Sequence, residues 1–234
     1  MSAPSEERSS FVRGIAAGLP VIIGYFPIAL TFGLLAAERM SIAHAIFMSA
    51  WVYAGASQFM ALELIGAQAA AVEIVIATFL MNFRHLIMSA SFSQRLERHR
   101  QAAALPLAFW LTDETFSVAM ASGRTVNPRY MLGLELTSYV SWVSGTCLGF
   151  AVGGFIPPLL QESMYIALYA LFVALLVPHV KRSLPILATA VFAAGVNTLL
   201  QRLQIMKPGW SLVAAILLAS ILGALTHSEN EDER

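Results

Sequence analysis

Apolar stretches long enough to cross a lipid bilayer recur from Gly14 almost to the C-terminus, and they limit the possible folds more than any other feature. A helix needs about 20 residues to cross the hydrocarbon core. With 58% hydrophobic and 12% charged residues, the chain also lacks the polar surface that a soluble globule needs. The pattern predicts one membrane domain at 14–226, between a polar N-terminal tail at 1–13 and an acidic C-terminal tail at 227–234.

The apolar runs are continuous, which favours helices over strands. A barrel strand needs only about 10 residues and alternates lipid-facing with lumen-facing side chains. Helices are the remaining way to pair every backbone polar group in lipid. We therefore predict an all-α, polytopic helical membrane protein with eight apolar segments, at residues 14–37, 43–66, 71–92, 102–121, 130–155, 163–180, 184–201 and 209–226.

The positions of Lys and Arg in the short loops favour seven crossings over eight. Thirteen of these residues lie outside the segments when Arg84 is left out, and eight simple crossings divide them seven to six, which is no bias. If segment 102–121 enters and leaves on one side, nine lie in the cytoplasm and four outside, with the N-terminus outside. The polar run Thr112-Asp113-Glu114 in that segment suits a broken or re-entrant piece.

A faint internal repeat is compatible with this arrangement. Segment 14–37 can be aligned with 130–155, and segment 71–92 with 184–201, although the spacing differs. If segment 102–121 does not cross, the two units have opposite orientation, an inverted repeat that is common in secondary transporters. The abundance of glycine and alanine could also produce the match by chance, so both alternatives remain open.

The first segment carries two prolines seven residues apart, Pro20 and Pro27, with Gly24 between them. An interior proline removes a backbone donor and clashes with the carbonyl four residues back. We expect a kink or unwinding near Gly24 to Pro27, where free backbone groups could bind a substrate. A simple packing kink is the alternative.

In segment 43–66, Ser57 and Gln58 could hydrogen-bond to a zwitterion or to another helix. Such interhelical bonds contribute about 0.6 kcal/mol on average, so a structural role is common. Glu63 is a candidate for proton coupling, because a carboxylate deep in a membrane costs a few kcal/mol unless it is paired, protonated or hydrated. It could also lie at the membrane interface.

Segment 71–92 places Asn82, Arg84 and His85 together, and the next segment supplies Asp113 and Glu114. A buried guanidinium needs an anion, so we predict an ion pair between Arg84 and one of these two acids. The pair could be a structural clamp, or it could bind a substrate carboxylate and ammonium. His85, Asp113 and Glu114 are also candidates for proton coupling.

The later segments offer weaker candidates. Segment 130–155 has a polar stripe at helical spacing, which predicts a face turned into the protein. Kinking or interhelical hydrogen bonding explains Pro178-His179 and Asn197 equally well. The members of the stripe are Glu135, Tyr139, Ser141, Trp142, Ser144 and Thr146.

Several classes of function are excluded. The net charge is zero, so nothing indicates nucleic-acid binding. The sequence has no phosphate-binding loop, paired-histidine metal motif or nucleophile elbow, so we expect no enzyme, cofactor, metal or direct use of ATP. The spacing of His85 and Asp113 matches no catalytic motif, so the sequence does not support an intramembrane enzyme that uses these two residues.

Five stretches, spread in order over nearly the whole chain, match one known family. They are Gly18-Leu19-Pro20 to Gly33, Ala54 to Phe59, Asn82-Phe83-Arg84-His85, Thr112-Asp113-Glu114, and Tyr165 to Pro178. In these stretches the chain resembles the AzlC-type large subunit of branched-chain amino-acid exporters. One departure is the run Tyr25-Phe26-Pro27-Ile28-Ala29, where the family more typically has Pro-Phe-Gly. The resemblance implies a multi-pass exporter in the bacterial inner membrane for valine, isoleucine and leucine, with methionine as a further candidate. It also implies a small hydrophobic AzlD-type partner subunit.

A second class of function remains open beside secondary transport. The chain could be a passive pore, or a non-transporting membrane subunit that stabilises a partner. Rings of like charge or a repeated selectivity sequence would favour a pore, and the sequence has neither.

Overall fold

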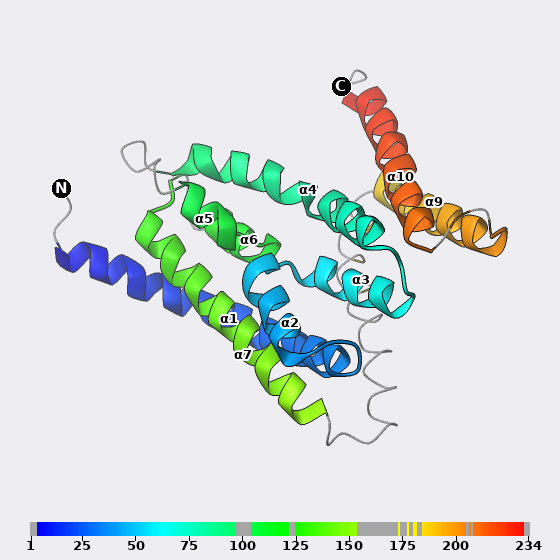
Figure 1. The fold of residues 1–234 in the computed structure, drawn as a ribbon. Coiled ribbons are helices and arrows are strands. Elements are labelled where there is room, and N and C mark those ends of the chain that lie inside the picture. Colours follow the sequence, from blue (N-terminus) through cyan, green and yellow to red (C-terminus); the bar gives the residue numbers. More distant parts are fainter. Residues whose placement is uncertain are drawn as a thin grey trace. The chain divides into compact units, whose positions relative to one another are not determined.

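The computed structural model describes residues 4–96, 104–121, 125–153, 173, 177, 180–181, 184–204, 206 and 208–231. Every regular element in this part of the chain is a helix, which confirms the predicted all-α class (Figure 1). The elements are α1 (Pro4–Ala37), α2 (Ile42–Phe47), the π-helix η1 (Met48–Val52), α3 (Gly55–Gly66), α4 (Ala71–Arg95), α5 (Ala104–Trp110), α6 (Asp113–Ala121), α7 (Pro128–Gly153), α9 (Leu184–Arg202) and α10 (Pro208–Glu231).

The chain forms two compact units. The first contains Met1–Phe59 and Asn82–Pro157, and the second contains Met60–Met81 and Pro158–Arg234. Among the described helices, Ser10–Ala37, Ala71–Arg95 and Leu184–Arg202 are long and apolar enough to cross a membrane. The expected segment 163–180, with its Pro178-His179 break, lies outside the described residues apart from 173, 177 and 180. The predicted number of crossings therefore stays a prediction.

Helices α1 and α7 pack through glycines and form the core of the first unit. A Cβ on Gly33 would lie 2.2 Å from the Thr146 carbonyl oxygen, and one on Gly149 would lie 2.0 Å from that of Leu30. Only glycine permits such close approach of two backbones, as in other small-residue helix contacts in membranes.

The two helices run in the same direction, since Gly14 lies beside Tyr130 and Gly33 lies beside Thr146. The opposite orientation expected for an inverted pair of segments 14–37 and 130–155 is therefore wrong. The cause is a chain reversal inside segment 43–66, which the sequence presents as one uninterrupted apolar run.

That reversal occurs at Tyr53 and Ala54, between η1 and α3. Tyr53 has φ 43° and ψ 46°, in the left-handed region. Before it, the Ser49 hydroxyl hydrogen-bonds to the Thr146 hydroxyl, and the Tyr139 hydroxyl donates to the Ala50 carbonyl. Segment 42–52 thus runs along α7 from its C-terminal half towards its middle.

After the break, the start of α3, residues 55–59, packs on the same pair of long helices. Gly55 lies against the ring of Trp142, and the Phe59 ring contacts Phe32 edge-on at 5.6 Å. Phe32 is next to Gly33, and Gly33 packs on Thr146 in the C-terminal half of α7. Phe59 therefore lies back towards the C-terminal half of α7, where segment 42–52 begins. Residues 42–59 therefore form a helical hairpin rather than a single helix.

Segment 102–121 is also broken, as predicted, between α5 and α6. The chain leaves the end of α4 and later returns to it, because the Val126 amide donates to the Arg95 carbonyl at 2.8 Å and Val126 pairs with Leu96. Leu96 and Val126, which flank this segment, thus lie side by side at one end of the first unit, and this placement agrees with the expected entry and exit on one side.

Helix α1 continues through Pro20 and Pro27, so of the expected kink or unwinding of the first segment the unwinding is wrong, and the kink stays a prediction. The two prolines and Gly24 lie on one exposed face, at a spacing of one and two helical turns. The opposite face of α1 packs against α7, and this packing holds the helix together where local propensity disfavours it.

In the second unit, the end of α3 and the start of α4 pack on α10. The buried residues of this core are Met60, Leu64, Ala77 and Val213. The Ser211 hydroxyl donates to Asn197 at 3.0 Å and joins α9 to α10, which is one of the two roles that the sequence left open for Asn197.

Candidate functional site

The break between α5 and α6 is built by a threonine pair. The Thr112 hydroxyl accepts from the Thr115 amide at 3.3 Å, and the Thr115 hydroxyl accepts from the Thr112 amide at 2.9 Å. This reciprocal arrangement caps the N-terminus of α6 in the manner of a capping box. Asp113 and Glu114 occupy the first turn, where the positive end of the helix dipole stabilises negative charge.

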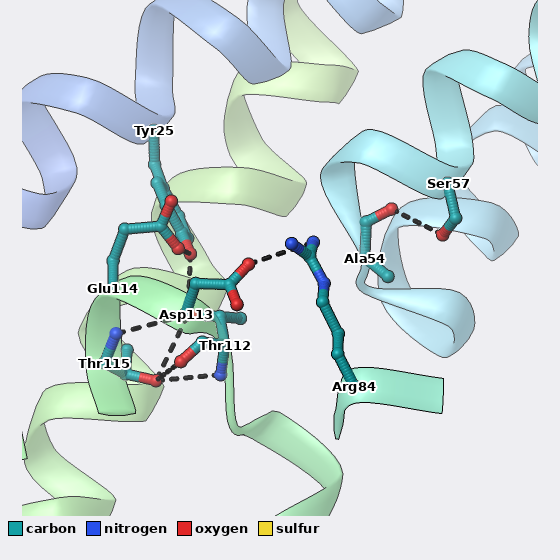
Figure 2. A network of polar contacts seen from close by, with 8 residues as sticks. All are labelled: Tyr25, Ala54, Ser57, Arg84, Thr112, Asp113, Glu114 and Thr115. Carbon is teal, nitrogen blue, oxygen red and sulfur yellow. Dashed lines mark hydrogen bonds and ion pairs between the residues drawn. The ribbon is translucent and has the colours of Figure 1, made fainter. Parts of the chain in front are cut away.

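Arg84 of α4 forms the ion pair predicted from the sequence. Its Nη2 lies 2.9 Å from the Asp113 Oδ2, and Figure 2 shows the guanidinium reaching across to the first turn of α6. The Arg84 and Asp113 side chains are 47% and 44% exposed. Charges within membrane segments usually face a water-filled cavity or the interior of the bundle, so this exposure indicates an accessible polar site.

Glu114 points the other way and is held by α1. The buried Tyr25 hydroxyl lies within hydrogen-bonding distance of the Glu114 carboxylate and 2.6 Å from the Thr112 hydroxyl (Figure 2). The first turn of α6 therefore presents two carboxylates, and Arg84 neutralises one of them. The remaining negative charge can attract a cationic group of a ligand.

The other break, at Tyr53, is surrounded by a neutral network. The fully buried Gln58 donates from Nε2 to the Ser49 hydroxyl and accepts from the Trp142 indole, both at 2.9 Å. The Ser49 hydroxyl lies 2.7 Å from the Thr146 hydroxyl. These bonds tie the two arms of the hairpin to α7.

The two breaks meet beside the middle of α7. The centroid of the Tyr139 ring lies 5.1 Å from that of the Tyr53 ring and 5.8 Å from that of the Trp110 ring. Close to each break, the rings of Trp51 and Phe109 are 6.0 Å apart. Two discontinuous helices thus bring their ends together within one unit.

The remaining predicted residues divide into two groups. Asn82 and His85 lie on α4 beside Arg84, and the Asn82 side-chain oxygen is buried with no hydrogen-bond partner in the described part of the chain. Ser57 donates to the Ala54 carbonyl at 2.9 Å. Glu63 belongs to the second unit, where it is half-buried.

Pro20, Gly24 and Pro27 do not join the ion pair. They lie on the exposed face of α1, while Tyr25 is on the buried face, and a Cβ on Gly24 would meet nothing within 4 Å. Their predicted substrate contact stays a prediction with no geometric support in this unit.

Two important residues were missed. Tyr25 gave no signal in the sequence beyond being a polar residue between two prolines. Glu135 was assigned only to the polar stripe of α7, yet its side chain is fully buried with neither oxygen hydrogen-bonded within the described residues. Only the folded structure shows that this carboxyl has no partner there.

A helical membrane protein whose broken helices meet at a polar site in mid-bundle has the architecture of a membrane transport protein. The comparisons with known proteins give the same class. The AzlC protein family matches residues 20–156, and the chain belongs to this family. Its role is membrane transport.

Relatives are found in bacteria and archaea. An uncharacterized membrane protein of Archaeoglobus fulgidus is 39% identical over 75% of this chain and 78% of its own length. The inner membrane protein YgaZ of Escherichia coli is 30% identical over 95% of this chain and 91% of its own length. The branched-chain amino acid transport protein AzlC of Bacillus subtilis is 22% identical over 76% of this chain and 70% of its own length. No solved structure matches this chain.

Proposed function

We propose that this chain is a secondary transporter that exports valine, isoleucine and leucine across the bacterial inner membrane, with methionine as a further candidate substrate. The observation that carries this proposal is the meeting of two broken helices beside the Arg84–Asp113 ion pair. The name of the Bacillus subtilis relative, a branched-chain amino acid transport protein, supports the class of substrate.

The chemistry of the site suits a zwitterion. In this proposal Asp113 and Glu114 bind the substrate ammonium, because together they carry one negative charge more than Arg84 balances. Arg84 binds the substrate carboxylate, helped by the first turn of α3, whose amide N–H groups have no acceptors within their own helix. The rings of Trp110 and Tyr139 provide an apolar wall for the aliphatic side chain.

A small hydrophobic AzlD-type subunit is part of the proposal, and it rests on the family resemblance. The described part of α9 has no buried residues, so this apolar helix offers a surface on which a small membrane subunit could pack. Co-purification of a small membrane protein with the tagged chain tests this point, and a chain that transports fully on its own would contradict it.

Efflux of labelled valine or isoleucine from cells loaded with dipeptides tests the transport function. We expect faster efflux in cells that carry the gene than in cells that lack it. Equal efflux in the two strains would overturn the proposal. Purified chain in liposomes then separates a transporter, which saturates with substrate, from a passive pore, which does not.

Two variants separate substrate binding from a structural clamp. Arg84→Ala and Asp113→Asn should each abolish efflux while the chain remains in the membrane at the normal amount. Arg95→Ala is the matched control, because Arg95 is an exposed arginine at the end of the same helix. A loss of protein that matches the loss of efflux in both variants would show that the pair is a clamp.

A further inference from the structure

Glu135, in the first half of α7, is a buried carboxyl without a hydrogen-bond partner in the described part of the chain. Its exposed fraction is 0%, and both Oε1 and Oε2 lack a partner there. A buried polar group normally forms hydrogen bonds, so an exception in a transport protein needs a physical explanation. The ion pair of Arg84 with Asp113 is a separate feature, since both of its members are half-exposed.

Burial without a partner fixes the charge state of this carboxyl. An ionised carboxylate in an apolar interior costs far more than a neutral one, so the group binds a proton. Among the described residues, no cation offsets the burial of this carboxyl. Burial without a partner therefore favours the neutral, protonated form of Glu135 in this conformation.

Tyr53 connects this carboxyl to the hairpin tip. Its hydroxyl is buried and has no hydrogen-bond partner within the described ranges, and its ring packs on the ring of Tyr139, which lies about one helical turn after Glu135 on α7. Its backbone is in the left-handed region, which is costly for a bulky residue and is often found at sites that move. A rearrangement at Tyr53 and Ala54 would change the access of water to Glu135.

We propose that Glu135 is the group that carries the coupled proton in the transport cycle. When the hairpin tip moves and water enters, the carboxyl O–H bond breaks, the proton passes to water and a carboxylate remains. The carboxylate takes up a proton from water on the other side before it is buried again. This inference rests on the proposed transport function, and it assigns the coupling step to a residue other than the substrate-binding acids.

Glutamine at position 135 tests the inference, because it copies the neutral acid in shape and cannot release a proton. The full-length chain is reconstituted in liposomes, alone and with its small partner. A gradient of one pH unit can sustain up to about a tenfold substrate ratio for each coupled proton. Wild type should accumulate substrate against its gradient, whereas Glu135→Gln should reach a ratio of one and still exchange labelled for unlabelled substrate.

Glu73→Gln is the matched control, because Glu73 is a glutamate of similar burial that packs against Gly209 in the second unit. It should keep pH-driven accumulation. Accumulation that persists in Glu135→Gln would overturn the inference and leave the proposed function intact. Loss of exchange together with accumulation, at a normal amount of folded protein, would overturn it too, because Glu135 would then bind substrate.

A measurement on wild type protects the test against misfolding of the variant. Dicyclohexylcarbodiimide reacts with protonated carboxyls in apolar surroundings, and mass spectrometry locates the adduct. We expect modification of Glu135 that declines as the pH rises, with or without transport. Absence of an adduct at every pH would overturn the inference. Wild type that moves no amino acid would instead overturn the proposed function.

Discussion

The two broken segments of the first unit reverse the chain by different means. Near Tyr53 the arms are joined by a buried, neutral network centred on Gln58. Near Thr112 the break carries two acids, and their partners are the half-exposed Arg84 and the buried Tyr25. The first arrangement leaves few polar groups free for a ligand, whereas the second presents charges to whatever enters. The comparison separates a break that supports the fold from one that can perform binding.

The sharpest test of the charged break is to exchange its charges. Arg84→Asp and Asp113→Arg should each reduce transport by at least about a hundredfold, since each replaces the ion pair by two side chains of like charge, a loss of about 3 kcal/mol. The double variant should restore the amount of folded protein without restoring transport, because the zwitterion would meet a reversed site. Substrate uptake by liposomes and immunoblots of the membrane fraction measure the two effects. Full recovery of transport in the double variant would show that the Arg84–Asp113 pair has only a structural role.

A substitution in the neutral network near Tyr53 should lower the stability of the folded protein. Gln58→Leu leaves the Ser49 hydroxyl and the Trp142 indole with fewer partners, which we expect to cost about 2 kcal/mol. Thermal unfolding in detergent measures the loss, and Gln94→Leu, at an exposed position of α4, is the control. The KM for substrate should stay within about twofold of wild type, because among the described residues the network forms no hydrogen bond with the charged break. A large rise in KM at normal stability would show that this break also binds substrate.

Tyr25→Phe should have an intermediate effect. The change removes the hydroxyl that lies between Thr112 and Glu114 and leaves the ring against Trp142. Loss of one hydrogen bond to a charged group corresponds to about 1.5 kcal/mol, or about a tenfold rise in KM. Initial rates of uptake over a range of substrate concentrations measure it. An unchanged KM would show that Glu114 does not bind the substrate ammonium as proposed.

Ser57→Ala should have the smallest effect. Ser57 is buried and its hydroxyl already donates to the Ala54 carbonyl, so the substitution removes a local bond worth about 0.6 kcal/mol. Transport should change by no more than about twofold. A tenfold loss would instead support the substrate contact predicted for Ser57 from the sequence, and it would weaken the contrast between the two breaks.

Features with a high energetic cost were predictable from the sequence. Arg84 and Asp113 stood out because isolated charges are expensive in a membrane, and the structure pairs them. The break at Thr112 was found for the same reason. The break at Tyr53 was missed because its neighbours are small or neutral and give no such signal.

Packing accounts for the errors. Pro20 and Pro27 predicted a kink or unwinding of the first helix, but the contact of the opposite face with α7 keeps α1 helical through both prolines. The absence of partners around Glu135 among the described residues depends on several helices at once, so no sequence pattern could reveal it. A residue that lacks contacts is visible only after the contacts of its neighbours are known.

The glycine contacts between α1 and α7 also bear on biosynthesis. Helix α7 begins at residue 128, long after α1 ends at residue 37. At about 5 to 20 residues per second, the ribosome needs about 5 to 20 s to supply the intervening chain. During that time Gly33 and Tyr25 face lipid or the insertion machinery, because the helix that covers them does not yet exist. A nascent chain arrested before α7 should therefore insert α1 without forming its glycine contacts.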